Sequence, residues 1–331
     1  MRPTDPSKTR RATLWLLLVT LIWGASFLWT EQGMAAAEAV ALRRGLEPSD
    51  LLPLGAALFV AGRFCLAWGL LWLAGRAAPA SRLAQRSDPA LGRAALAYAA
   101  AMLSGFLLQT ESLGELDASV GAFLTSAYVS FTAILTTIVK RRLPGAWTWG
   151  GVALATFGAG FIDGPPQVAF GFAAWQALLS ALIFAVGILM TDRFTRRHDP
   201  VVLTRVTMGF VAIGALAWLG LHLWRAAPEL RDATFEVTQE WAFWRPLVLN
   251  AVLANVVALL LINLFQRQLD PVRAAILYSL EPVWTAVWVF VLIGLAPGPW
   301  LWLGGAALLV GNLVVELAPS RRPDASDPAQ T

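Results

Sequence analysis

Long apolar stretches alternate with short polar stretches along almost the whole chain of 331 residues. Each apolar stretch runs to about 20 residues, the length that an α-helix needs to cross the ~30 Å hydrocarbon core of a bilayer. Several of them contain no charged residue. The pattern predicts ten transmembrane helices, at residues 13–33, 53–75, 94–113, 118–139, 145–162, 169–191, 200–224, 244–265, 271–295 and 299–317.

The composition agrees with this pattern. Hydrophobic residues make up 57% of the chain, charged residues only 14%, and the mean hydropathy is +0.62. A soluble domain has about a quarter of its residues charged, because it must cover its surface with polar groups. We therefore expect an all-α, polytopic membrane protein that lies in a lipid bilayer.

The basic residues predict the orientation. Of the 25 Lys and Arg residues, Arg63 and Arg205 lie within helices, and 18 fall on the side of the membrane that holds the N-terminus. Lys and Arg are retained on the cytoplasmic side during insertion. The prediction is a cytoplasmic-membrane protein with cytoplasmic tails at 1–12 and 318–331, the first of them disordered to Arg10. The outer loops hold only Arg43, Arg44, Arg225, Arg231 and Arg245.

Several classes of function are disfavoured by what the chain lacks. The net charge of +4 comes from residues spread over short loops, which argues against a nucleic-acid partner. Cys65 has no second cysteine to pair with, and His198 and His222 are too few and too far apart for a metal site. The sequence contains no HExxH, GxSxG or Walker A motif. We predict no enzyme activity, no cofactor and no metal.

An internal repeat relates the two halves. Shifting the chain by 153 positions aligns residues 117–158 with 270–311 without gaps and gives 13 identities in 42 positions. Apolar matches are common between membrane helices, whereas proline, glycine and tryptophan matches at one offset are not. We interpret the chain as two five-helix repeats, at 13–162 and 169–317. The second copy of a five-helix unit must enter the membrane from the opposite side, and such inverted repeats are typical of secondary transporters.

Glu281 is the strongest candidate for a functional residue. It lies eleven residues into its predicted helix, about 16 Å along the axis and so near the middle of the bilayer. An ionisable group at that depth needs a cavity or a partner. Pro282 follows it, removes a backbone N–H and frees the carbonyl of Tyr278, which predicts a helix break. A substrate site and a structural kink remain equal alternatives.

The other candidates for a substrate cavity carry weaker signals. Arg63 and Arg205 could each attract an anionic group of a substrate. Alternatively, each could extend its charged head group to the membrane interface, an interpretation that is favoured for Arg205. Gln109 lies near the outer end of its helix, and Asn255 is as well suited to a hydrogen bond between helices as to ligand binding. Aromatic residues that could line a cavity are Trp23, Tyr128 and Trp284, with Tyr278 beside them.

The sequence resembles the drug/metabolite transporter superfamily, specifically its EamA-type members, over roughly residues 12–317. The likeness rests on the runs Leu21–Gly24 and Gly62–Phe64, on Leu280–Trp284, and on the Trp300, Gly304 and Gly311 pattern of the last helix. It implies ten helices, an inverted repeat, export or exchange of metabolites, and a central cavity lined mainly by helices one, three, four, six, eight and nine.

Two departures from the family pattern restrict what the resemblance can supply. Lys140–Arg142 and Gly294–Ala296 stand where family members usually carry a Gly-Glu pair, and Tyr128-Val129 replaces a second Glu-Pro. We therefore carry over the fold but no substrate and no coupling ion.

The sequence thus predicts a secondary transporter of a small organic metabolite that works by alternating access. The alternatives are a membrane enzyme acting on a lipid-type substrate, with only Glu281 and Arg63 available as catalytic groups, and a non-transporting accessory subunit. A homodimer stays open.

Overall fold

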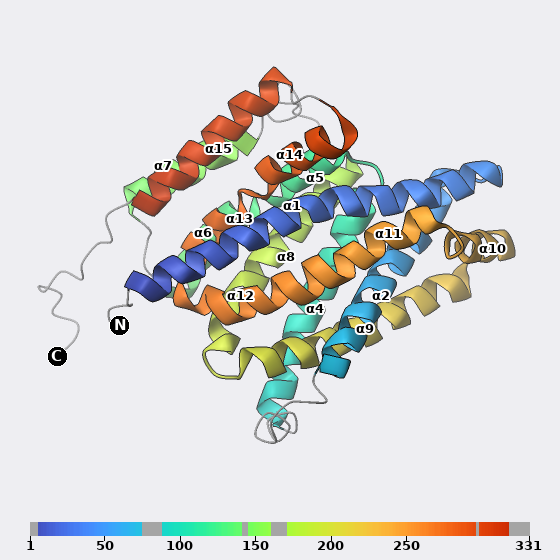
Figure 1. The fold of residues 1–331 in the computed structure, drawn as a ribbon, viewed down its shortest axis with the longest axis horizontal. Helices are drawn as coiled ribbons and strands as arrows, with labels where there is room; N and C mark the ends of the chain where they lie inside the picture. The colour runs from blue at the N-terminus through green and yellow to red at the C-terminus, as the bar shows by residue number, and fades with distance from the viewer. Residues whose placement is uncertain (1–5, 75–87, 141–144, 160–170, 296–297, 318–331) are drawn as a thin grey trace, which may run out of the picture.

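The computed structural model describes residues 6–74, 88–140, 145–159, 171–295 and 298–317, and no strand occurs among them. The helices lie side by side in one bundle (Figure 1). In chain order they are α1 (Pro6–Arg43), α2 (Pro48–Ala74), α4 (Pro89–Ser112), α5 (Ala118–Thr125), α6 (Tyr128–Lys140), α7 (Ala146–Ala159), α8 (Phe172–Thr195), α9 (Pro200–Arg225), α10 (Pro228–Val237), α11 (Trp241–Leu249), the π-helix η2 (Asn250–Ala258), α12 (Leu259–Phe265), the 3₁₀-helix η3 (Gln266–Gln268), α13 (Pro271–Tyr278), α14 (Glu281–Ile293) and α15 (Pro299–Leu317).

Eight helical segments in the described part of the chain are long and apolar enough to cross a membrane. They correspond to eight of the ten predicted helices, so the chain is a multi-pass membrane protein. The remaining two predicted helices are α7 and α15, which pack against each other at one side of the bundle (Figure 1). Ten crossings therefore stays a prediction.

Helix α1 is longer than the sequence pattern indicated. Its 38 residues begin at Pro6 and end at Arg43, whereas the predicted helix covered only 13–33. Residues 6–10, expected in a disordered tail, are helical. A helix of this length spans about 57 Å, which exceeds the ~30 Å hydrocarbon core. Hydropathy marks the part of a helix that contacts lipid and says little about the polar turns that continue it.

Three Asp-Pro pairs begin helices at the ends predicted to be cytoplasmic. The carboxyl of Asp88 accepts from the Ala90 N–H at 2.8 Å at the start of α4. Asp199 and Asp270 cap α9 and α13 in the same way, and each is followed by a proline at the first helical position. The aspartate side chain accepts hydrogen bonds from N–H groups of the first turn, which have no partner within the helix. Proline suits the first helical position because it has no N–H group that would need a partner.

Two of the membrane segments are interrupted, and the interruptions fall at equivalent positions. The segment from Ala118 breaks at Ser126–Ala127, and the segment from Pro271 breaks at Ser279–Leu280. These breaks are 153 residues apart, as are the starts of α5 and α13, of α6 and α14, and of α7 and α15. The offset found between proline, glycine and tryptophan positions is therefore also the offset between helix boundaries.

The break in the second half does not depend on Pro282 alone. The first half breaks at the same place with Val129 where the second half has Pro282. In both breaks a serine hydroxyl donates to the carbonyl three residues earlier, Ser126 to Phe123 and Ser279 to Ile276, each at 2.7 Å. Such a bond gives the backbone an alternative to the regular helical ladder.

The broken segments pack crosswise, α5 against α14 and α6 against α13. This brings both breaks to the same region of the bundle.

At one side of the bundle, α15 lies very close to α7. A Cβ on Gly311 would lie 2.6 Å from the backbone nitrogen of Ala155 and 2.6 Å from the carbonyl oxygen of Gly151. Small residues allow such approach where no water drives helices together. The fifth and tenth predicted helices therefore pack closely through Gly151 and Gly311.

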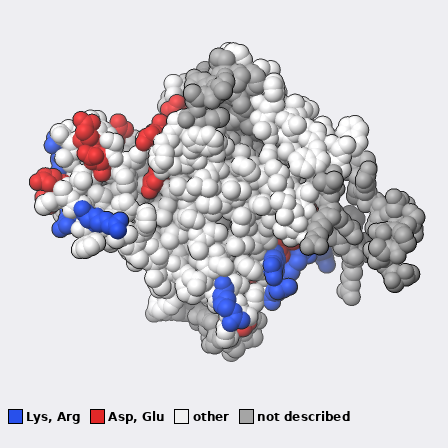
Figure 2. Space-filling model, turned by 180° about the vertical axis from the view of Figure 1, so that it is seen from behind, with Lys and Arg blue, Asp and Glu red and all other residues white. Residues whose placement is uncertain are grey.

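Charged side chains gather toward the margins of the molecule and leave a broad uncharged face between them (Figure 2).

At one end of the molecule lies α10, which the sequence pattern did not predict because it is too short and polar to cross a bilayer. The guanidinium groups of Arg43 and Arg44 bind the carboxyl of Glu236 on α10 at 3.1 and 2.6 Å, and Arg43 also pairs with Glu240. These two cations hold the pKa of Glu236 below its ordinary value.

Candidate functional site

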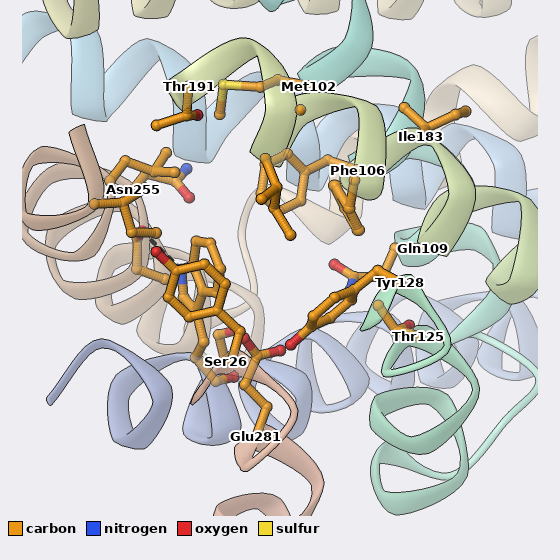
Figure 3. Close-up of a pocket in the computed structure, with 18 of the residues that line it drawn as sticks. Ser26, Met102, Phe106, Gln109, Thr125, Tyr128, Ile183, Thr191, Asn255 and Glu281 are labelled. Atoms are coloured by element: carbon orange, nitrogen blue, oxygen red, sulfur yellow. Dashed lines mark hydrogen bonds between the residues drawn. The ribbon is translucent and has the colours of Figure 1, made fainter. Parts of the chain in front are cut away.

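A cavity of about 760 Å³, including the part open to solvent, lies in the middle of the bundle. Both halves of the chain contribute to its wall: α1, α2, α4, α5 and α6 from the first, and α8, the η2 to η3 segment, α13 and α14 from the second. Figure 3 shows labelled side chains from several of these helices pointing toward one another around the cavity. Apart from the contribution of α2, these are the helices that the family resemblance implies.

The two helix breaks place one polar side chain each in the cavity wall. Tyr128 is the first residue of α6, and Glu281 is the first residue of α14. They occupy equivalent positions of the repeat, and both are buried, with 4% and 3% of their surface exposed. In Figure 3 the Tyr128 hydroxyl and the Glu281 carboxyl face each other. The two groups do not meet the geometry of a hydrogen bond, and neither Tyr128 OH nor Glu281 Oε1 has another partner.

Arg63 enters the same cavity from α2. Its side chain is 2% exposed, and its Nε and Nη2 atoms have no hydrogen-bond partner. The guanidinium carbon lies 4.5 Å from the centre of the Phe106 ring and 5.2 Å from that of Phe64. Ring faces attract a cation but do not accept its edge N–H groups in the way that an oxygen does. The cavity therefore holds a cation and a carboxyl group, and no ion pair joins them within the described residues.

The π-helix η2 shapes another part of the wall. Nine residues of π-helix are unusual, and π-helical turns occur frequently at functional sites. The indole of Trp23 donates to the Ala254 carbonyl of this turn at 3.2 Å. Asn255 lies in the same turn, and neither its amide nitrogen nor its amide oxygen has a partner. Asn250 donates weakly to Thr30 Oγ1 at 3.4 Å, and its own oxygen lacks a donor.

Two sets of hydrogen bonds join neighbouring helices in one part of the cavity wall. The Tyr278 hydroxyl donates to Gln266 Oε1 at 3.0 Å, and the Gln266 amide donates to the Ile188 carbonyl at 2.8 Å. Thr191 donates to the Tyr98 hydroxyl at 2.8 Å. These bonds connect α13 and η3 to α8, and α8 to α4, so that residues of both halves are joined in this part of the wall.

Unsatisfied polar atoms are concentrated at the cavity. Thirteen buried side-chain nitrogen and oxygen atoms among the described residues have no hydrogen-bond partner, and eight of them belong to residues that line this cavity. Leaving a buried polar group unpaired costs about 1–3 kcal/mol. A concentration of such groups around one space indicates that a polar ligand or water completes their bonding. The residues concerned are Arg63, Thr125, Tyr128, Asn250, Asn255 and Glu281.

Seven of the eight side chains that the sequence singled out line the cavity; Pro282, predicted as the helix break, lies in the first turn of α14. The exception is Trp284, whose indole turns toward α1 and donates to Thr20 Oγ1 at 3.1 Å. Arg205 is also elsewhere, with Nε and Nη2 both donating to the Leu71 carbonyl, at 2.9 and 2.7 Å. The seven are Glu281, Tyr278, Tyr128, Trp23, Arg63, Asn255 and Gln109.

Sequence reasoning missed several residues of the wall. Tyr98 completes a set in which all three tyrosines of the chain line the cavity. Gln266 also lines the cavity, and Phe106 and Phe184 make an edge-to-face pair with ring centres 5.1 Å apart. The polar residues Tyr98 and Gln266 in apolar segments carried a usable signal, whereas Phe106 and Phe184 look like any lipid-facing phenylalanine. No group of three His, Cys, Asp or Glu side chains that could hold a metal ion occurs in the described part of the chain.

Comparison with known proteins gives three results. The profile of the EamA-like transporter family matches residues 171–317, which is the second half of the chain. A protein of Archaeoglobus fulgidus described as "Uncharacterized transporter" is 24% identical over 214 residues. That match covers 64% of this chain and 65% of the relative, so it spans slightly less than two thirds of the relative's length.

A solved structure described as "Crystal structure of protein" has a TM-score of 0.66 and 17% sequence identity to this chain. The alignment covers 93% of this chain and 97% of the solved one. At this identity the likeness shows a shared fold, and it extends over both halves.

Proposed function

We propose, from the premise that this chain is an EamA-type member of the drug/metabolite transporter superfamily, that it is a secondary transporter of a small organic metabolite. The transporter exports or exchanges its substrate across the cytoplasmic membrane. The observation that carries this proposal is the central cavity, which is lined by both halves and holds eight unpaired buried polar atoms.

The proposed mechanism is alternating access, with the two halves as inverted repeats that rock about the cavity. Its support is the 153-residue offset shared by the sequence match and the two helix breaks. The crosswise packing of α5 with α14 and of α6 with α13 agrees with it, because the first part of each broken segment meets the second part of the other. Half-helices that begin in the middle of a membrane present free N–H groups and side chains to a bound solute.

The proposed topology has both termini in the cytoplasm. A reporter that fluoresces only in the cytoplasm should be bright when fused after residue 331, and alkaline phosphatase fused there should be inactive. Phosphatase inserted beside Arg231 in α10, at the opposite membrane face, should be active, because folding of that enzyme requires the oxidising exterior. An active phosphatase at the C-terminus would mean an odd number of crossings and would exclude the inverted repeat.

Filling the cavity should stop transport without unfolding the protein. Gly187 lines the cavity, and a Cβ built there meets only Tyr98 Cε2, at 3.8 Å. Gly187→Ala should therefore transport nearly normally, whereas the ring of Gly187→Phe should occupy the space that a substrate needs. Deletion and overexpressing cells screened against toxic metabolites identify the transported solute, and uptake by proteoliposomes then measures each variant.

Gly220→Phe is the matched control, because Gly220 lies in α9 with nothing within 4 Å of a Cβ placed there. The control should fold and transport. If Gly187→Phe transports as fast as Gly220→Phe, the substrate does not pass through this cavity and the proposed pathway is wrong.

A further inference from the structure

Arg63 lies in the cavity wall and has no protein partner for two of its donors. It is 2% exposed, and its guanidinium carbon is 4.5, 5.2 and 5.8 Å from the ring centres of Phe106, Phe64 and Phe59. The guanidinium therefore lies among three aromatic rings in the cavity wall. An arginine buried in this way is held in one orientation, with its free N–H groups directed by the packing around it.

The free atoms are Nε and Nη2, which together form one edge of the guanidinium. This edge presents two parallel N–H groups at the spacing of two carboxylate oxygens. The chain contains an internal comparison, since Arg205 lies in the second helix of the second half as Arg63 lies in the second helix of the first. In Arg205 the same edge is filled by the Leu71 carbonyl, at 2.9 and 2.7 Å. Arg205 therefore has a structural partner, whereas the same edge of Arg63 is buried in the cavity wall without one.

The charge of Arg63 is also unmatched. No carboxylate lies within ion-pair distance of it in the described part of the chain, although Glu281 lines the same cavity. Arg63 is the only basic residue among the described cavity-lining side chains. One cation with one free edge matches a group of charge −1. A phosphate monoester would bring a second negative charge into a cavity that already contains Glu281.

We infer that the solute bound in this cavity carries a single carboxylate, held side-on by Arg63 Nε and Nη2. The inference rests on the proposed function and names the chemical class of its substrate. The remainder of the solute is apolar where it passes Phe106 and Phe184, whose rings meet edge to face next to Arg63. The transported molecules are therefore organic monocarboxylates with an apolar or aromatic body.

Matched pairs of ligands test this on the purified full-length protein. Each pair is a monocarboxylate and its primary amide, for example 3-phenylpropanoate with 3-phenylpropanamide, over a series of short, branched and aromatic bodies. Two further probes share the phenylalkyl body, 2-phenylethyl phosphate and 2-phenylethylamine. We expect carboxylates to raise the midpoint of thermal unfolding in a saturable manner and their amides to leave it unchanged. A carboxylate offers two charged oxygens to the two N–H groups of Arg63, whereas an amide offers one uncharged oxygen and an NH₂ group that cannot accept.

Variants assign the effect to Arg63. Arg63→Lys keeps the charge but lacks the two-pronged edge, and we expect it to weaken carboxylate binding by roughly tenfold or more. Arg63→Gln should lose the response to carboxylates. Arg205→Lys serves as the control, since it changes an arginine outside the cavity and should keep the wild-type carboxylate dependence even if its midpoint is lower. Monodispersity on size exclusion shows that each variant is folded.

Three results would overturn the inference: a response to amides equal to that of carboxylates, a response only to the phosphate or the amine, or no response to any carboxylate. Retention of carboxylate binding by Arg63→Gln would overturn it as well. Counterflow in proteoliposomes separates this from the proposed function. If the protein moves an amine or a neutral solute, the proposed transport function stands and the inferred carboxylate substrate is wrong. If a carboxylate binds at Arg63 but no solute moves, the inferred ligand class stands and the proposed transport function is wrong.

Discussion

Replacing Glu281 with glutamine is expected to give a folded protein whose transport falls about tenfold or more, the effect of removing one charged hydrogen-bonding group from a buried site. Glu281 is 3% exposed, lies at the first position of α14, and faces Tyr128 across the cavity (Figure 3). Glutamine has the same shape and still forms hydrogen bonds, so the packing of α14 is preserved. It cannot ionise, and so it can neither neutralise a cationic group of a substrate nor carry a proton.

Initial rates of uptake into proteoliposomes at several pH values measure this effect. Any transport that remains in Glu281→Gln should not vary with the ionisation of a cavity carboxyl, because the amide does not titrate. Glu111→Gln is the matched control. Glu111 lies in α4, accepts from the Gln176 amide at 2.9 Å and does not line the cavity. Normal transport by Glu281→Gln at every pH would reduce this carboxyl to a structural role and leave Arg63 as the centre of the site.

Enlarging Gly24 is expected to have the largest effect on stability. A Cβ at this position would lie 2.5 Å from Trp284 Cβ, 2.9 Å from the Glu281 carbonyl oxygen and 3.0 Å from the Thr285 backbone nitrogen. Two of these three atoms are backbone and cannot move aside. Overpacking of this kind costs about 1–3 kcal/mol for one added methyl-sized group. We expect Gly24→Ala to lower the midpoint of thermal unfolding by about 4 °C or more and Gly24→Val to prevent stable folding.

The close approach matters because α1 supports α14 directly beside the helix break. Thr285 Oγ1 donates to the Gly24 carbonyl at 2.9 Å, Trp284 donates to Thr20 at 3.1 Å, and Trp288 donates to the Leu21 carbonyl at 3.1 Å. A residue that separates the helices breaks these bonds together and displaces Glu281.

Gly69→Val is the control for Gly24→Val. Gly69 lies in α2 with nothing within 4 Å of a built Cβ, so the same substitution there should be tolerated. Thermal unfolding followed in detergent, together with size exclusion, compares the variants. Equal midpoints for Gly24→Val and Gly69→Val would contradict the close contact between α1 and α14.

Features that depend on local chemistry and on position along the chain were predictable from the sequence. Apolar length identified all eight of the candidate membrane spans, because the bilayer sets a minimum helix length whatever the neighbours are. The 153-residue offset paired Tyr128 with Glu281, and Pro282 predicted the helix break of the second half. The break at Ser126–Ala127 was not predicted, because the first half has Val129 in place of that proline. Glu281 itself was recognisable because an ionisable group deep in an apolar segment needs a cavity or a partner.

Features that depend on which helices meet were decided by the tertiary structure. The sequence gives Arg63 and Arg205 equivalent standing, one arginine in the second helix of each half. Packing alone places the Leu71 carbonyl against Arg205 and leaves Arg63 among three rings with an unpaired edge. Trp284 was expected in the cavity and instead bonds to α1, since the rotation of α14 is fixed by Gly24 and Thr285.

The π-helix η2 and the short helix α10 belong to the same category, because neither has an apolar period that distinguishes it from an ordinary helix or a loop. Contacts with other helices stabilise both of these elements. Trp23 donates to the Ala254 carbonyl of η2, and Arg43 and Arg44 bind Glu236 on α10. The sequence by itself therefore determined that the chain crosses a membrane repeatedly and that the second half breaks beside Pro282. The packing of the helices decided which of their polar side chains remain unpaired and so available to a ligand.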